Sequence, residues 1–139
     1  MRRLSDIVCN QNPLTLPQTA SVKAACEQMR DHRAGSVLVT DDAGALVGIF
    51  TGRDAVCRVL AAGRSAARTK LRQVMTASPV TMTANLTAID ALRRMWDGGF
   101  RHVPLVEGGR ILGCVSRGDF QGDEHTRLEE ERELWEHMR

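Results

Sequence analysis

The 139-residue sequence has no tyrosine, only three phenylalanines and two tryptophans, and no apolar run near the length of a membrane span. A transmembrane helix needs about 20 consecutive apolar residues, and nucleic-acid-binding surfaces usually interleave aromatic with basic side chains. The first residues include two arginines but no apolar core behind them, so no secretory signal is predicted. These absences predict a cytoplasmic protein that binds neither nucleic acid nor membrane.

Cysteine is also sparse, and its four positions form no C-x-x-C pair: Cys9, Cys26, Cys57 and Cys114. We interpret them as four buried thiols in a reducing compartment. The four histidines have no ligand spacing with one another or with the cysteines, so no metal site is predicted. No activated nucleophile or nucleophile elbow is visible, and we therefore predict that the chain is not an enzyme and needs no catalytic cofactor.

Charge is unevenly distributed beneath a net charge of +2. Residues 1–122 carry 16 Lys and Arg against 10 Asp and Glu, whereas residues 123–139 carry 3 against 7. Residues 1–122, the body of the chain, are mildly basic, which suits a small anionic ligand. The acidic tail is predicted to form a separate helix with a narrow apolar stripe, which packs either on its own body or on another subunit or effector protein.

An internal repeat covers the whole body. The pattern G-x-x-S/T-x-x-D occurs at residues 48–54 and again 65 residues later at 113–119. Residues 12–16, N-P-L-T-L, resemble residues 78–82, S-P-V-T-M, at an offset of 66. Because the offset drifts only at expected loops, we interpret the body as a duplication.

Each copy shows the pattern of a β-α-β-β-α unit. Residues 21–32 have the apolar spacing of a helix, with Ser21 or, in the second copy, Asn85 as the expected N-cap. Hairpins are predicted for 36–40 with 46–50 and for 102–106 with 111–115, followed by helices at 54–62 and near Arg117. The predicted fold class is α+β (α/β), with two tandem units related by a pseudo-twofold axis. The predicted divisions are 1–62, the linker 63–70, 71–122 and the tail helix 123–139.

The duplicated serine or threonine and aspartate allow two interpretations. Such a pair at the start of a helix is close to a capping box, which needs no ligand. A strand that leads into a helix also presents free N–H groups that attract phosphate, and a carboxylate there can accept two hydrogen bonds from a ribose diol. Arginines lie near both copies, and their guanidinium groups suit bidentate phosphate contacts.

The sequence resembles the paired CBS-domain module over residues 4–122. The resemblance rests on V-M-T-A-S-P-V-T at 74–81, on R-H-V-P-L-V at 101–106, on G-S-V-L-V-T-D at 35–41, and on the two G-x-x-S/T-x-x-D segments. The family implies two clefts between the repeats, in which many members bind an adenosine derivative. It implies AMP as the favoured ligand here, with ADP, ATP, NAD and S-adenosylmethionine as alternatives.

Carried onto this sequence, the resemblance implies that Asp54 and Asp119 hold ribose, with Thr51 and Ser116 beside them. It places phosphate near Arg53, Arg101, His102 and Arg117. It places adenine near Thr15, Thr81 and the first residues of the following strands, namely Ser36, Val37, Val103 and Pro104. Because the first copy reads A-G-S where the second reads R-H-V, unequal sites are expected, and the site of Ser116 and Asp119 is favoured.

Two functions are compatible with this resemblance. The first is a regulatory, non-catalytic module that senses an adenosine nucleotide and signals through rearrangement of its repeats or of a homodimer. The second is an interaction or dimerisation module of the same fold that binds no ligand. In both, the apolar helix faces around residues 56–60 and 119–120 are the expected dimer contacts.

Overall fold

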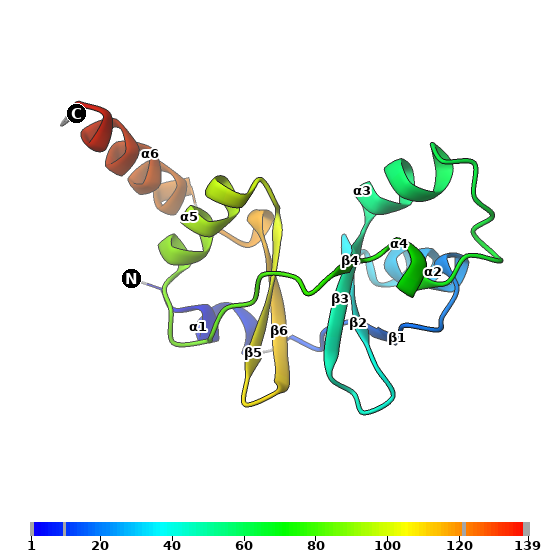
Figure 1. Ribbon diagram of the computed structural model, residues 1–139. Coiled ribbons are helices and arrows are strands. Elements are labelled where there is room, and N and C mark those ends of the chain that lie inside the picture. The colour runs from blue at the N-terminus through cyan, green and yellow to red at the C-terminus, as the bar shows by residue number, and fades with distance from the viewer. Residues whose placement is uncertain (1, 10, 121, 138–139) are drawn as a thin grey trace. The chain divides into compact units, whose positions relative to one another are not determined.

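The computed structural model describes residues 2–9, 11–120 and 122–137. Residues 1, 10, 121, 138 and 139, which belong to the expected repeats and tail, lie outside the described residues. Within the described ranges, no helix is both long enough and apolar enough to span a bilayer. The chain divides into two compact units that alternate along the sequence (Figure 1): one comprises Met1–Gln11, Thr81–Glu107 and Leu112–Arg139, and the other Asn12–Val80 and Gly108–Ile111.

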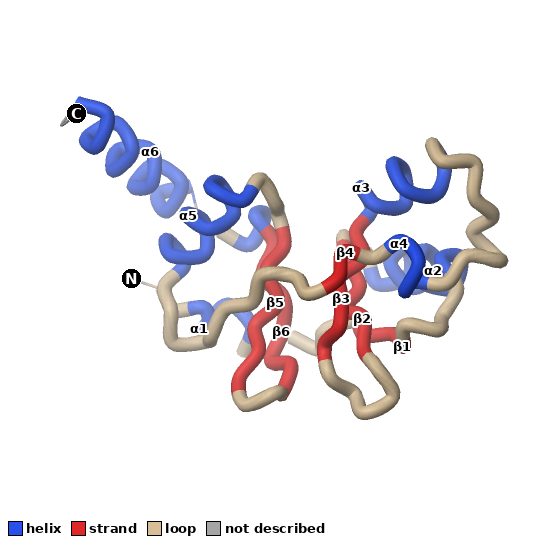
Figure 2. The backbone as a smooth tube through the Cα atoms, viewed as in Figure 1, coloured by secondary structure: helices blue, strands red, loops and turns tan. Residues whose placement is uncertain are grey.

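The unit that contains the body of the first repeat is built on a four-stranded sheet of order β1-β2-β3-β4 (Figure 2). β1 runs parallel to β2, while β3 is antiparallel to both β2 and β4. Its elements are β1 Thr15–Pro17, α2 Val22–His32, β2 Ser36–Thr40, β3 Leu46–Thr51, α3 Gly52–Asp54, the π-helical η1 Ala55–Leu60, α4 Leu71–Val74 and β4 Thr76–Ala77.

Helix α2 forms where its spacing predicts. Ser21 Oγ accepts a hydrogen bond from the Ala24 amide at 3.0 Å, which caps the helix. Val22, Ala25 and Met29 recur at intervals of three and four residues and are buried. They pack in one cluster with the inward side chains of β2 and β3 and with α4 from the start of the second repeat. Apolar burial on one helix face therefore holds the sheet together with the lead-in of the second repeat, meaning residues 71–82, which precede its first long helix.

The other unit contains the body of the second repeat and the start of the first. Strands β5 and β6 pair in a two-stranded sheet, and Met82 makes a parallel bridge to Leu105. Leu4 and Val8 join the core of this unit together with residues of α5. The elements are α1 Leu4–Val8, α5 Ala88–Gly98, β5 His102–Glu107, β6 Arg110–Ser116, the 3-10 turn η2 Arg117–Asp119, and α6 Gly122–His137.

The fold class is confirmed: the chain mixes helices and strands, carries two repeats, and ends in a helix. Both expected hairpins form, as β2–β3 and β5–β6. The two short helices α1 and α4 were not predicted. They lie at the N-terminal end of each lead-in, and their four or five residues are too few to show a helical period.

Two local predictions for the second repeat are wrong. Asn85 is not the N-cap of α5; Thr87 holds that position, and Asn85 instead accepts a hydrogen bond from Thr83 Oγ1 at 2.6 Å. The helix expected near Arg117 is only the three-residue turn η2, after which Phe120 becomes extended and α6 starts at Gly122. Phe120 is buried in the core, so the chain turns inward there and the helix cannot continue.

One burial prediction also needs correction. Of the four cysteines, Cys9 and Cys57 are exposed, and only Cys26 and Cys114 are partly buried; all four are free thiols. Burial raises the pKa of the Cys26 thiol, which keeps it protonated and unreactive. On η1, Val59 is buried, whereas Val56 and Leu60, from the face expected to make dimer contacts, are 57% and 74% exposed.

Candidate functional site

The first G-x-x-S/T-x-x-D segment forms a closed hydrogen-bonded turn where β3 ends. Asp54 Oδ2 accepts hydrogen bonds from the Thr51 amide at 3.0 Å and from Thr51 Oγ1 at 3.1 Å. The Asp54 amide in turn donates to Thr51 Oγ1 at 3.2 Å. These reciprocal bonds satisfy N–H groups that the start of a helix leaves open, so the expected capping box exists.

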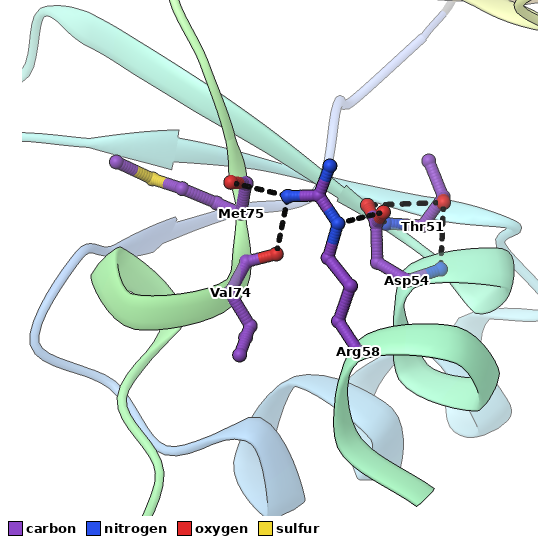
Figure 3. A network of polar contacts seen from close by, with 5 residues as sticks. All are labelled: Thr51, Asp54, Arg58, Val74 and Met75. Carbon is purple, nitrogen blue, oxygen red and sulfur yellow. Dashed lines mark hydrogen bonds and ion pairs between the residues drawn. The ribbon is translucent and has the colours of Figure 1, made fainter. Parts of the chain in front are cut away.

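The same carboxylate also holds an arginine (Figure 3). Arg58 Nε lies 3.5 Å from Asp54 Oδ1. Its Nη1 donates to the backbone carbonyls of Val74 at 3.2 Å and of Met75 at 3.1 Å, where α4 ends. Both oxygens of Asp54 are therefore engaged, and the carboxylate side chain is only 13% exposed.

The second copy of the motif repeats the turn but not the arginine. Asp119 Oδ2 accepts hydrogen bonds from the Ser116 amide at 2.7 Å and from Ser116 Oγ at 3.2 Å. The residue is exposed, and among the described residues no Lys or Arg pairs with its carboxylate. The position 65 residues after Arg58 is Asp123, an acid instead of a base. The two motifs thus share a turn and differ in charge.

A third copy of the turn acts as a pure cap. At the start of α5, Asp90 Oδ2 accepts from the Thr87 amide and from Thr87 Oγ1, both at 2.9 Å. The hydrogen bond from the Thr87 amide is the largest cause that lowers the pKa of Asp90, and Arg93 adds to it. Capping geometry alone therefore does not identify a binding site. The turns differ in the charged residues that surround each carboxylate.

The backbone brings two arginines to the second motif. The Arg117 amide donates to the Arg101 carbonyl at 2.9 Å, next to Ser116. At the matching place of the first motif, the Gly52 amide donates to the Gly35 carbonyl at 3.2 Å. The second turn is thus flanked by two guanidinium-bearing residues where the first has two glycines. The surroundings of the two turns are therefore unequal in charge-bearing residues.

Other predicted residues of the first repeat lie around the β-sheet. Ser36 pairs directly with Thr51 across β2 and β3, and Val37 is buried beside it. Thr15 pairs with Leu38 on β1, and Arg53 is exposed on α3. Among the described residues, no hydrogen bond or ion pair joins Thr15 or Arg53 to the carboxylate of the first motif.

The remaining predicted residues belong to the second repeat. His102 begins β5, and the next two residues of that strand, Val103 and Pro104, are buried. The Pro104 carbonyl accepts a hydrogen bond from the Met82 amide at 3.1 Å, which places the exposed Thr81 directly before this bridge. The strand and the lead-in that the resemblance assigned to adenine are therefore neighbours within one unit.

Arg117 lies against an aromatic ring. Its guanidinium carbon is 4.8 Å from the centroid of the Trp96 ring, and Arg132 of α6 lies 5.2 Å from the same centroid. The Arg117 Nε atom is buried without a hydrogen-bond partner in the described part of the chain. Cation–π contact with Trp96 of α5 thus orients Arg117. Arg132 brings α6 to the same ring.

Sequence reasoning missed two arginines at these turns. Arg58 follows Asp54 by four residues, a spacing that favours an ion pair on a helix, so a search for such pairs would have found it. Arg2 donates to the Asp119 carbonyl at 2.9 Å and pairs with Glu124 Oε1 at 2.6 Å. No local pattern could have indicated that contact, because 122 residues separate Arg2 from Glu124.

Within the described residues, no group of three or more His, Cys, Asp or Glu side chains lies close enough together to hold a metal ion. What each of the two turns offers instead is a carboxylate at the end of a strand, with guanidinium-bearing residues nearby; Arg58 contacts the first carboxylate, whereas Arg101 and Arg117 flank the second turn. Carboxylates bind hydroxyl donors, and guanidinium groups bind phosphate. The second turn therefore has the chemistry of a small polar, anionic ligand site.

Comparison with known proteins identifies the class to which this arrangement belongs. The family model described as CBS domain matches residues 4–60 and again 71–121. The chain belongs to the CBS-domain family, whose members are generally regulatory and non-catalytic modules.

Among its relatives, a CBS domain-containing protein of Arabidopsis thaliana is 35% identical over 116 residues, which cover 84% of this chain and 21% of that protein. The chain thus spans about a fifth of the length of the first curated relatives it matches. A solved CBS-domain protein from Agrobacterium tumefaciens is 33% identical with a TM-score of 0.77, over 84% of this chain and 89% of that one. A CBS domain protein from Pyrobaculum aerophilum, solved in complex with AMP, has a TM-score of 0.81 at 22% identity, over 91% of this chain and 98% of that one.

Proposed function

We propose that this chain is a regulatory module that binds an adenosine nucleotide at the turn of Ser116 and Asp119. The observation that carries the proposal is the asymmetry between the two turns. The Asp119 carboxylate is exposed and oriented by Ser116, and Arg101 and Arg117 flank the same turn. A nucleotide requires a carboxylate that accepts hydrogen bonds from the ribose diol, next to guanidinium groups that donate hydrogen bonds to the phosphate.

AMP is the first ligand to test, because a chain of the same fold has been solved with it. ADP, ATP, NAD and S-adenosylmethionine form the rest of the panel, since each carries the same ribose diol. In the proposed mechanism, the ligand binds one arrangement of the repeats more tightly than another and so shifts the population toward it. A partner protein would read that arrangement.

The experiment is a thermal-shift titration of the wild type and of Asp119→Ala with AMP. At about 100 times its Kd, a ligand stabilises by about 2.7 kcal/mol, which is a rise of several degrees for a chain of this size. The rise should be absent in Asp119→Ala. Asp90→Ala is the matched control, because it removes the same kind of capping carboxylate from α5 and should keep the full AMP response.

A second candidate is a dimerisation or interaction module without a ligand. It is favoured by the exposed apolar side chains Val56 and Leu60 on η1 and Leu134 and Trp135 on α6. A wild-type protein that responds to no member of the nucleotide panel but forms a dimer would replace the first proposal with this one. In both proposals a homodimer forms through η1, and α6 offers its exposed end to an effector.

A further inference from the structure

The first turn differs from the second by having its own cation in place. Arg58 reaches back from η1 and contacts the Asp54 carboxylate and two backbone carbonyls at the end of α4. All five residues of this network belong to one compact unit. Because β4 follows Met75 directly and pairs with β3, the carbonyls that Arg58 holds lie on the chain segment beside the strand that leads to Thr51.

The contacts of Arg58 reduce what the Asp54 carboxylate could offer a ligand. Asp54 Oδ2 already accepts two hydrogen bonds from Thr51, and Arg58 takes Oδ1. A vicinal diol needs acceptor positions on this carboxylate, so it has to compete with a guanidinium that is covalently part of the chain. Such an internal competitor lowers the apparent affinity by the fraction of time that the site is open.

We propose that Arg58 occupies the first site from within and that this is why the chain has one working nucleotide site, at Asp119, rather than two. The inference rests on the proposed function, because it assumes that the second turn binds nucleotide. Arg58 would then determine how many turns of this chain bind nucleotide, a role that the family resemblance does not imply. Arg58 acts by holding Asp54 and the end of α4, and not by touching the ligand.

A different role for the same contacts is purely structural. The last carbonyls of a helix lack intrahelical partners, and Arg58 satisfies two of them at α4. On that basis its removal would lower stability and change nothing else. The two roles differ in one measurable quantity, the number of AMP molecules bound per chain.

The test is isothermal titration of AMP into the wild type and into Arg58→Ala. The expected stoichiometry rises from about one to about two AMP per chain, because both turns are then open. Arg58→Met is the second variant, since it keeps the apolar stem that covers the protein surface and so protects the fold if alanine does not. Adding Asp54→Ala to either variant should return the stoichiometry to that of the wild type.

Arg93→Ala is the matched control. Arg93 pairs with Asp90 Oδ1 at 3.4 Å in the third turn, which is the same kind of contact at a place with no proposed site. It should leave the AMP stoichiometry unchanged.

Several outcomes would overturn the inference: two AMP molecules bound to the wild type, no gain in both Arg58 variants, or loss of AMP binding in Arg58→Ala. A wild type that binds no AMP, together with an Arg58→Ala variant that gains an Asp54-dependent site, would overturn the proposed function at Asp119 and, with it, the single working site; only the occupation of the first turn by Arg58 would stand. If no variant binds AMP, both fail.

Discussion

At the residue scale, the same turn serves three purposes in this chain. The pair Thr87 and Asp90 caps α5 and has no proposed ligand role. The pair Thr51 and Asp54 is closed by Arg58, and the pair Ser116 and Asp119 stays exposed. Because the hydrogen bonds inside the three turns are so similar, what distinguishes them is the charge that surrounds each carboxylate.

The cap at Asp90 predicts a pH-dependent stability. Its folded pKa is lowered, chiefly by the hydrogen bond from the Thr87 amide, so its contribution is complete above the unfolded pKa of about 3.9 and is lost as the pH falls through the folded pKa. Asp90→Asn should cost about 0.5–1 kcal/mol at pH 7, and the difference from the wild type should shrink as the pH falls below about 3.9.

Urea unfolding between pH 7 and pH 3 measures this difference. Asp42→Asn is the control, since Asp42 is exposed in the β2–β3 turn and should show little difference at any pH. A cost for Asp90→Asn that stays constant down to pH 3 would contradict an electrostatic origin.

At the element scale, α6 is held to its unit near its first turn. Glu124 is only 7% exposed in its side chain and pairs with Arg2 at 2.6 Å, while Arg2 also donates to the Asp119 carbonyl. Leu128 is buried one turn further on, whereas Leu134 and Trp135 are exposed. The first half of α6 therefore packs on its own unit, and its second half leaves the large apolar side chains Leu134 and Trp135 exposed.

Removing Arg2 should loosen the start of α6. Arg2→Ala deprives a buried carboxylate of its 2.6 Å partner, and we expect a loss of about 1–3 kcal/mol. The double variant with Glu124→Ala should lose less than the sum of the two single variants, because the two residues interact directly. Amide hydrogen exchange of residues 122–130 should be faster in Arg2→Ala than in the wild type, by the factor that corresponds to the lost stability. Unchanged exchange would contradict the prediction and show that the packing of Leu128 is enough to hold the helix.

At the scale of the whole molecule, the units do not follow the order of the repeats. Each unit takes the body of one repeat together with the lead-in that precedes the other. In one unit Leu4 and Val8 pack with α5, and in the other Leu71 and Val74 pack with α2. Neither repeat completes its core from its own contiguous segment, so we expect the two repeats to fold together.

The homodimer proposal is tested at this scale. Val56→Asp combined with Leu60→Asp places two charges on the exposed face of η1, and a buried unpaired charge in an interface is strongly unfavourable. Light scattering at micromolar concentration should change from a dimer to a monomer. Leu134→Asp, at an equally exposed position on α6, should leave the dimer intact. A wild type that is already monomeric would contradict the proposal.

Much of this protein was predictable from the sequence because it depends on local spacing. The cap of α2 by Ser21 and the turn between each Ser or Thr and its Asp join residues three positions apart. The hairpins follow from short apolar runs separated by brief connectors, and the duplication is visible as the same motif written twice. The unequal surroundings of the two turns were also foreseeable, since Arg117 lies inside the second motif and Arg101 directly precedes the apolar run predicted to pair with the strand of that motif. The N-cap at Thr87 was missed because Asn85 fits the same local rule.

Only the tertiary structure decided the rest. Arg58 meets carbonyls 16 and 17 residues away, Arg2 meets Glu124 across 122 residues, and Phe120 turns into the core and ends the helix expected after Arg117. No repeated residue spacing in the sequence indicates these contacts, because each depends on where the packing of separate segments places one side chain. The repeats determined which turns this chain has, and long-range packing determined which of those turns is left exposed.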